Sequence, residues 1–451
     1  MEKLSSSVIN GDLRTLIRIS LPIFVFLFCE SLTAFGERTF LSYYGIEALS
    51  GALNGLYLAF IFQSPCIAIA SMGQVFVGLY QGNGNLKQIG PCVWQLVWFS
   101  FLSLAVTLPL SFWCSSFYFR ATALEQAGTQ YFNILALGNF LFPLNTALAS
   151  FYLGRGKTLL VTFLLLTSYA FNLGLCWLLV FGVKGFIPAL GIQGAALAKC
   201  LSMGLFCLLF LGFFLTKKNR ECYDTGCWKF SPRLFWSYLR SGLTRAFGYL
   251  WTRICWAGIS YLMMKKGGGY LDVQTVGGTV ISFLLFVPAG IYRAVLTIVP
   301  NLLGDRNYSE IWRFCRSLMI YVAIVGAVLL MPIVVYPQML ICFFDVSSRE
   351  LFQQNFSRIN HWVWLFLLAN TIQMGFCGFI VAARRLRIQF YSYFLSTVTS
   401  LLPVYLFLNL GECAPDKLWF IMALENVIMA FIFFYFLRSR REGDELSAAE
   451  H

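Results

Sequence analysis

The chain alternates long apolar stretches with short turns that carry glycine, proline or charged residues. A helix needs about 20 apolar residues to cross the hydrocarbon core of a bilayer, and each of these stretches reaches that length. The pattern therefore predicts an all-α polytopic membrane protein with twelve transmembrane helices. Their expected bounds are 14–41, 49–79, 91–116, 127–153, 158–182, 190–216, 236–264, 275–303, 314–344, 358–383, 389–410 and 416–438.

The longest polar stretch divides these helices into two groups of six. The second and eighth predicted helices end alike, with glycine and a short polar turn, at Gly78–Lys87 and Asn301–Asn307. Matching features six helices apart indicate a parallel internal repeat, an arrangement that places a transporter's substrate between its halves. We expect an N-terminal lobe of residues 1–216, a cytoplasmic linker of 217–235, and a C-terminal lobe of 236–451 that ends in a short charged tail.

Composition agrees with a membrane protein, because 59% of the 451 residues are apolar and only 12% are charged. In globular proteins about a quarter of all residues are charged, and these residues cover the surface that faces water. This excludes a soluble enzyme, a disordered regulator and a small secreted domain held by disulfides. The fourteen cysteines lie mostly in apolar segments without CxxC pairs or nearby histidines, so they predict no metal site.

The basic residues give the expected orientation. If the N-terminus is cytoplasmic, 21 of the 33 lysines and arginines fall in segments on the cytoplasmic side, eight on the other side and four within helices. Positive charge accumulates on the cytoplasmic side of membrane proteins. We therefore expect a multi-pass protein of the cell inner (plasma) membrane with both termini in the cytoplasm. The orientation in the membrane explains the net charge of +13, which therefore does not indicate a nucleic-acid partner.

Several short segments, in order along the whole chain, resemble the multidrug and toxic compound extrusion (MATE) family of the multidrug/oligosaccharidyl-lipid/polysaccharide exporter superfamily. The resemblance is firm in the first half and looser in the second. The segments are Ser20–Pro22 with Glu37 fifteen residues after the proline, Glu47–Leu49, Gln81–Asn85, Tyr152–Thr158, Asn172–Trp177 and Gly191–Ala198.

The resemblance implies a fold of two six-helix lobes that form a V, and export of a substrate by alternating access. It also implies a cation or proton site inside the first lobe, built by an acid of the first helix with polar groups of the fifth and sixth. Carried over by position, the acid is Glu37 and its amide neighbour is Asn172. Two positions depart from the family pattern, since Cys176 replaces an acid or amide and Lys199 a threonine.

Charged groups within a bilayer are costly, so Glu37 is a functional candidate on physical grounds as well. Low-dielectric surroundings favour the neutral form of a carboxylic acid, which allows proton exchange near physiological pH. Glu30 lies two turns earlier on the same helix face and is a candidate for the substrate cavity. The alternatives are that Glu37 lies at the outer end of its helix beside Arg38 or solvent, and that Glu30 is simply hydrogen-bonded.

Lys199 favours protons over sodium as the coupling ion. If the sixth helix packs beside the first, the ammonium takes the electrostatic place of a bound Na⁺, and a thiol and an amine stand where a hard cation needs oxygen ligands. We therefore expect proton coupling through a Glu37–Lys199 pair, with no cofactor and no bound metal. In the alternative, Lys199 only extends toward a membrane interface.

The second half lacks the acids that some relatives carry there. The position that holds a glutamate in the seventh helix is Thr252, and the tenth helix has no acid between Phe366 and Ala383. Arginines lie within the seventh and eighth helices instead, and inside a cavity they would favour an anionic substrate. Otherwise they pair with Glu30, Glu425 or backbone carbonyls. These candidates for the substrate cavity are Arg245, Arg253 and Arg293.

We therefore expect a secondary active antiporter of the MATE type that exports small organic molecules, with the lipid bilayer as its surroundings and a monomer as its working form. One alternative is an exporter or flippase of an anionic or lipid-linked sugar. Another is a polytopic membrane transferase. An enzyme would need a clustered catalytic set at one membrane face, and the loops contain no such pair of His and Asp or of two acids.

Overall fold

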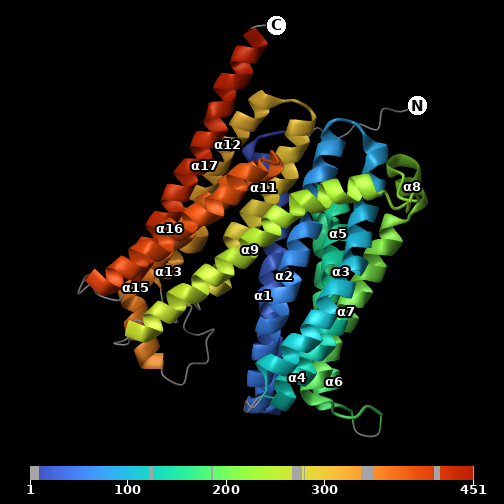
Figure 1. Ribbon diagram of the computed structural model, residues 1–451, viewed down its shortest axis with the longest axis vertical. Coiled ribbons are helices and arrows are strands. Elements are labelled where there is room, and N and C mark those ends of the chain that lie inside the picture. Colours follow the sequence, from blue (N-terminus) through green and yellow to red (C-terminus); the bar gives the residue numbers. More distant parts are fainter. Residues whose placement is uncertain are drawn as a thin grey trace. The chain divides into compact units, whose positions relative to one another are not determined.

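The computed structural model describes residues 10–120, 125–183, 186–266, 277–278, 280–336, 349–410 and 417–449, and these are almost entirely helical (Figure 1). Each of the twelve predicted segments overlaps a helix, so the all-α fold class is confirmed. Among the described residues, ten helices are long and apolar enough to span a membrane, or eleven if one bent pair counts as a single span.

The helices follow one another with short connections. In the first half they are α1 (Leu13–Tyr44), α2 (Ile46–Gly82), α3 (Ile89–Tyr118), α4 (Glu125–Leu137), α5 (Leu141–Leu153), α6 (Thr158–Phe181), α7 (Gly191–Phe214) and α8 (Lys217–Tyr223). After them come α9 (Pro232–Lys266), α11 (Phe286–Gly304), α12 (Tyr308–Val325), α13 (Pro332–Val335), α15 (Arg349–Ala382), α16 (Leu386–Leu410) and α17 (Lys417–Ala449).

The chain forms two compact units. The first contains residues 21–250 and 300–306, and the second contains 10–20, 251–299 and the chain from 307 onward. In the first unit α2 packs against α3, α4 and α5, and α6 packs against α7. In the second, α15 and α16 pack against α17. The lobe boundaries expected from the sequence remain a prediction.

The fourth predicted helix, 127–153, is not continuous. It is broken into α4 and α5, which are bent by 42° relative to each other. Pro143 has no N–H to bond the carbonyl of residue 139, so the helical ladder cannot run through this point. Asn139 at the break uses its side chain instead, with Nδ2 donating to Thr107 Oγ1 on α3 at 3.1 Å. One continuous helix was therefore the wrong expectation here.

The ninth predicted helix, 314–344, also differs from the expectation. It begins earlier, as α12, and continues through a five-residue π-helical turn, Gly326–Leu330, into α13. Pro332 again removes a backbone donor, and a wider turn accommodates the ring. The part of the prediction that covers 337–344 lies outside the described residues.

The two glycine-marked helix ends predicted at α2 and α11 meet each other. A Cβ added to Gly82 would lie 2.0 Å from the backbone oxygen of Asn301, and one added to Gly304 would lie 2.4 Å from that of Leu79. The Asn301 side chain donates to the Gly154 carbonyl at 2.7 Å. Only residues without a side chain allow this backbone approach, which joins residues far apart in sequence within the first unit.

The expected linker, 217–235, is a structured segment. It starts with the short helix α8 and then lies along α3. Gln95 donates to the Lys229 carbonyl at 2.9 Å and accepts from the Ser231 N–H at 3.0 Å. The indole of Trp94 donates to the Thr225 carbonyl at 2.8 Å. Side chains of a membrane helix therefore hold this polar segment in place.

Candidate ion-coupling site

Glu37 lies on α1, seven residues before the end of the helix, and is held by side chains from two other helices. Its Oε1 accepts a hydrogen bond from Nδ2 of Asn172 on α6, at 2.5 Å. Its Oε2 lies 3.1 Å from Nζ of Lys199 on α7, which forms an ion pair with it. The Glu37 and Lys199 side chains are only 10% and 17% exposed. The structure therefore brings these three predicted residues together, and Glu37 does not face solvent.

Glycines allow the three helices to approach closely enough for these contacts. A Cβ on Gly36 would lie 2.7 Å from Cδ2 of Leu173, where α1 meets α6. A Cβ on Gly194 would lie 2.5 Å from the Leu179 backbone oxygen, where α7 meets α6. Gly191 begins α7 with φ +54°, in the left-handed region that favours glycine, and lies against the Tyr44 ring. The site therefore depends on backbone packing as well as on its polar side chains.

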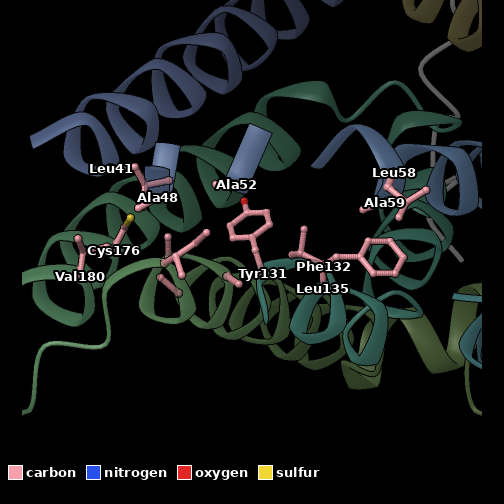
Figure 2. Close-up of a cluster of buried hydrophobic side chains, with 14 of the residues drawn as sticks. Leu41, Ala48, Ala52, Leu58, Ala59, Tyr131, Phe132, Leu135, Cys176 and Val180 are labelled. Atoms are coloured by element: carbon pink, nitrogen blue, oxygen red, sulfur yellow. The ribbon is translucent and has the colours of Figure 1, made fainter. Parts of the chain in front are cut away.

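A buried apolar cluster surrounds the polar contacts. It joins residues of α1, α2, α4, α6 and α7, and Figure 2 shows Cys176 and Tyr131 among them. Cys176, the thiol at the departing family position, is fully buried. Such surroundings are poor in polar groups, so the hydrogen bonds from Asn172 and Lys199 are needed to compensate the burial of the carboxylate.

Sequence reasoning missed Tyr131. This α4 side chain is 3% exposed and interacts electrostatically with both Glu37 and Lys199. A tyrosine within a predicted apolar span was its only signal, and such residues are common packing residues. Its hydroxyl adds a polar group from a fourth helix to the site.

Both carboxylate oxygens of Glu37 face a donor, one from an amide and one from an ammonium. Hydrogen bonds that involve a charged group are stronger than those between neutral groups, so this geometry suits an ion pair between Glu37 and Lys199. Asn172 Oδ1 is buried and, within the described chain, has no hydrogen-bond partner. A proton on Glu37 would remove the attraction to Lys199 and weaken the link between α1 and α7.

The described residues contain no group of three or more His, Cys, Asp or Glu side chains that could hold a metal ion. Of the side chains that interact with Glu37, Asn172 and Tyr131 carry an oxygen atom, while Lys199 and Cys176 bring nitrogen and sulfur. A hard cation prefers several oxygen ligands, and here the ammonium already contacts one carboxylate oxygen.

The candidates for the substrate cavity have different surroundings. Glu30 is exposed on α1 and interacts electrostatically with Lys199. Thr252 is exposed on α9 in the second unit, and Arg293 is half-buried on α11 in the same unit. Arg253 lies in α9, and its side chain is outside the described part of the structure. The role of each in a cavity stays a prediction.

Arg245 is buried in the first unit, where α9 lies against α2. Its Nη1 donates to Ser71 Oγ at 2.6 Å, and the guanidinium carbon lies 5.8 Å from the centre of the Tyr249 ring. A Cβ added to Gly242, one turn earlier, would lie 2.8 Å from Ile69, so the two helices approach closely at this level. A buried guanidinium with a hydroxyl neighbour is suited to hold an anionic group.

Comparison with protein families gives two matches to one family model. The model of the MatE family matches residues 22–178 and again residues 249–406, which together make up more than half of the chain. One model that matches each half is what the predicted internal repeat requires.

Curated relatives are distant. The probable multidrug resistance protein NorM of Bacillus subtilis is 26% identical over 190 residues, which is 41% of this chain and 41% of that protein. The probable multidrug resistance protein NorM of Bacillus cereus is 21% identical over 365 residues, 80% of this chain and 78% of that protein. The match to the first of these therefore spans less than half of its length.

Solved structures share the fold along nearly the whole chain. A transporter of the MOP superfamily from Pyrococcus furiosus superposes with a TM-score of 0.86 at 17% identity and covers 98% of both chains. An outward-facing multidrug resistance MATE family transporter gives 0.83 at 15% identity, over 98% of this chain and 99% of that one. The eukaryotic MATE transporter AtDTX14 gives 0.78 at 17% identity, over 94% of each chain.

Breaking the ion pair should destabilise the fold. Lys199→Met leaves a buried carboxylate without its cation, so we expect a loss of about 3–5 kcal/mol in the free energy of unfolding. In the double variant Glu37→Gln, Lys199→Met no charge is left unpaired, so its loss should be clearly smaller than the sum of the single losses. Unfolding in detergent micelles measures all three, with the exposed Lys87→Met as control. Additive losses would show that the two groups are not coupled.

Proposed function

Because the chain belongs to the MatE family, we propose that it is a secondary active antiporter that exports small organic molecules by alternating access and is driven by protons. The observation that carries the proton step is the contact of one buried carboxylate with Asn172 and Lys199. The names of the distant bacterial relatives support multidrug efflux as the class of activity. The proposed location is the cell inner (plasma) membrane, with both termini in the cytoplasm and a monomer as the working form.

The proposed coupling step uses the charge of the pair. With Glu37 ionised, attraction to Lys199 holds α1 against α7. A proton that reaches Glu37 neutralises the carboxylate, and the ammonium then loses its partner in a low-dielectric site. The two helices separate more easily in this state, and return of the proton to the other side restores the contact. Substrate and proton compete because the proton favours the state in which α1 separates from α7, and the substrate favours the state in which the two helices are in contact.

Protons fit this site better than sodium. A bound Na⁺ would need to displace the Lys199 ammonium, which lies 3.1 Å from Glu37 Oε2. At Cys176 it would meet a thiol in place of the oxygen ligand that the family pattern has there. A proton needs only one carboxylate oxygen. Lys199 therefore stands in place of a resident cation, and the proton acts by breaking its ion pair.

Loss of the carboxyl should abolish coupling. In proteoliposomes loaded with ethidium, a proton gradient in sodium-free buffer should drive export by the parent chain, and Glu37→Gln should reduce the rate to that of empty liposomes. Glu47→Gln, at an exposed acid near the start of α2, is the matched control and should keep the parent rate. Full proton-driven export by Glu37→Gln would remove the coupling role.

Loss of the ammonium should open the site to sodium. Lys199→Thr replaces a fixed cation with a hydroxyl oxygen, so we expect export by this variant to respond to an imposed sodium gradient. The parent should not respond. The same assay, run with sodium and proton gradients applied separately, makes the comparison. A parent that follows sodium and ignores protons would contradict the proposed ion.

A second candidate substrate class is supported by Arg245. This arginine is 4% exposed and donates to Ser71. The transporter from Pyrococcus furiosus has a binding pocket of reverse polarity, which suggests a different function for that protein. By analogy, the second candidate is an exporter of anionic molecules, including lipid-linked sugars, through the same cycle.

Removal of the charge at Arg245 distinguishes between the two substrate classes, small organic cations and anionic molecules. If anions are the substrates, the parent should export carboxyfluorescein faster than ethidium. Arg245→Gln should then slow carboxyfluorescein export strongly, while Arg240→Gln, at an exposed position of the same helix, should not. Export of ethidium alone, unaffected by Arg245→Gln, would leave only the first class.

A further inference from the structure

A second carboxyl is buried in a membrane-spanning helix, far along the chain from Glu37. Glu425 lies in α17 within the second unit and is 9% exposed. Its Oε1 accepts a hydrogen bond from Ser396 Oγ of α16 at 2.9 Å. It also lies beyond the second segment that the family model matches, which ends at residue 406. Acidic side chains inside a membrane are costly to retain, which makes each one a candidate for function.

The charged groups on the helices around Glu425 lie at other levels. Lys417 on the same helix is eight residues away and Arg387 on α16 is nine residues before Ser396, each more than 10 Å along the axis. On α15, His361 and Arg358 are nine and twelve residues before Asn370, which is hydrogen-bonded to the neighbour of Glu425, Asn426. None of these provides the short ion pair that Lys199 provides for Glu37.

Two further titratable side chains, a tyrosine and a cysteine, lie on the packed helices α16 and α15. Tyr393 on α16 uses its hydroxyl to accept from Gln389, and Cys377 lies on α15 two turns beyond Asn370. α9 reaches α16 through the hydrogen bond of Trp251 to Thr397, and the side chain of Arg253 on α9 is outside the described residues. α12 reaches α17 at Phe434, nine residues beyond Glu425.

The polar groups on the adjoining faces are rich in acceptors. Asn370 donates through Nδ2 to Asn426 Oδ1 at 2.8 Å. Its own Oδ1, and Oε1 of Gln373 one turn further, are buried and lack a hydrogen-bond partner in the described chain. An ionised carboxylate would add two further acceptors to this layer. A protonated one brings an O–H donor and no charge.

We propose that Glu425 is a second proton-binding carboxyl of this transporter, located in the second unit. This rests on the proposed proton-driven function and extends it. Glu37 contacts a fixed cation, whereas Glu425 has one hydroxyl donor among the described side chains, Ser396, and binds its proton as a neutral acid. The two carboxyls therefore differ in the free-energy cost that controls the proton: loss of the ion pair with Lys199 opposes protonation of Glu37, whereas the cost of burying a charge opposes ionisation of Glu425.

Infrared difference spectroscopy of the purified full chain in nanodiscs tests this without transport. In sodium-free buffer, a carboxylic acid C=O band should appear as the pH is lowered from 10 to 5, and it should be missing from Glu425→Gln but retained by Glu37→Gln. Glu425→Asp should restore a titrating band. Spectra of the parent and Glu425→Gln that are identical at every pH would overturn the proposal, and so would a band that disappears on adding sodium at constant pH.

Ser396→Ala provides a test that keeps the acid in place. Because the hydroxyl donates to the carboxylate, its removal disfavours the ionised form, and the band should persist to higher pH than in the parent. A titration identical to the parent's would contradict the assigned site. Transport reports separately on the proposed function: a chain that does not export any dye would refute antiport, while the infrared titration would still decide whether Glu425 takes up a proton.

Discussion

A charge buried inside a membrane protein costs free energy unless an opposite charge or hydrogen bonds compensate it, and this constraint organises the first unit. The Glu37 carboxylate satisfies it by contact with Lys199 and Asn172, so α1, α6 and α7 must remain close together. Glycine at residues 36, 191 and 194 allows the backbones of these helices to approach one another closely. The pair is therefore a structural link between helices, and in the proposed mechanism it is also the point at which a single proton changes their attraction.

The two halves of the chain match the same family model and yet treat buried charge differently. The first unit compensates its acid with an ammonium, whereas the acid of the second unit has a hydroxyl donor within a layer of amides. Arg245 adds a buried cation where α9 meets α2. Each of these groups costs free energy to bury, and in a helical bundle such costs are concentrated where ions or substrates are handled.

Much of the fold could be predicted because the bilayer imposes length and apolarity on each helix. The break between α4 and α5 could not be predicted, since Gly138 and Pro143 lie within an apolar run that is long enough to be one helix. The contact of Glu37 with Asn172 and Lys199 followed from a family resemblance, because no spacing within one helix brings the three together. Tyr131 was missed, as periodicity does not distinguish a packing tyrosine from one beside an ion pair. Docking of the 217–235 segment depends on Gln95 and Trp94 of α3, which its own polar composition does not reveal.

The most direct measurement is amide hydrogen exchange by mass spectrometry of the parent and Glu37→Gln, compared at the same pH. If the carboxylate holds the three helices together, the last turns of α1 and the first turns of α7 should exchange clearly faster in the variant, while α15 and α17 remain unchanged. Equal exchange in α1 and α7 of the two proteins would show that the ion pair does not hold this unit together, and the account of coupling would be wrong.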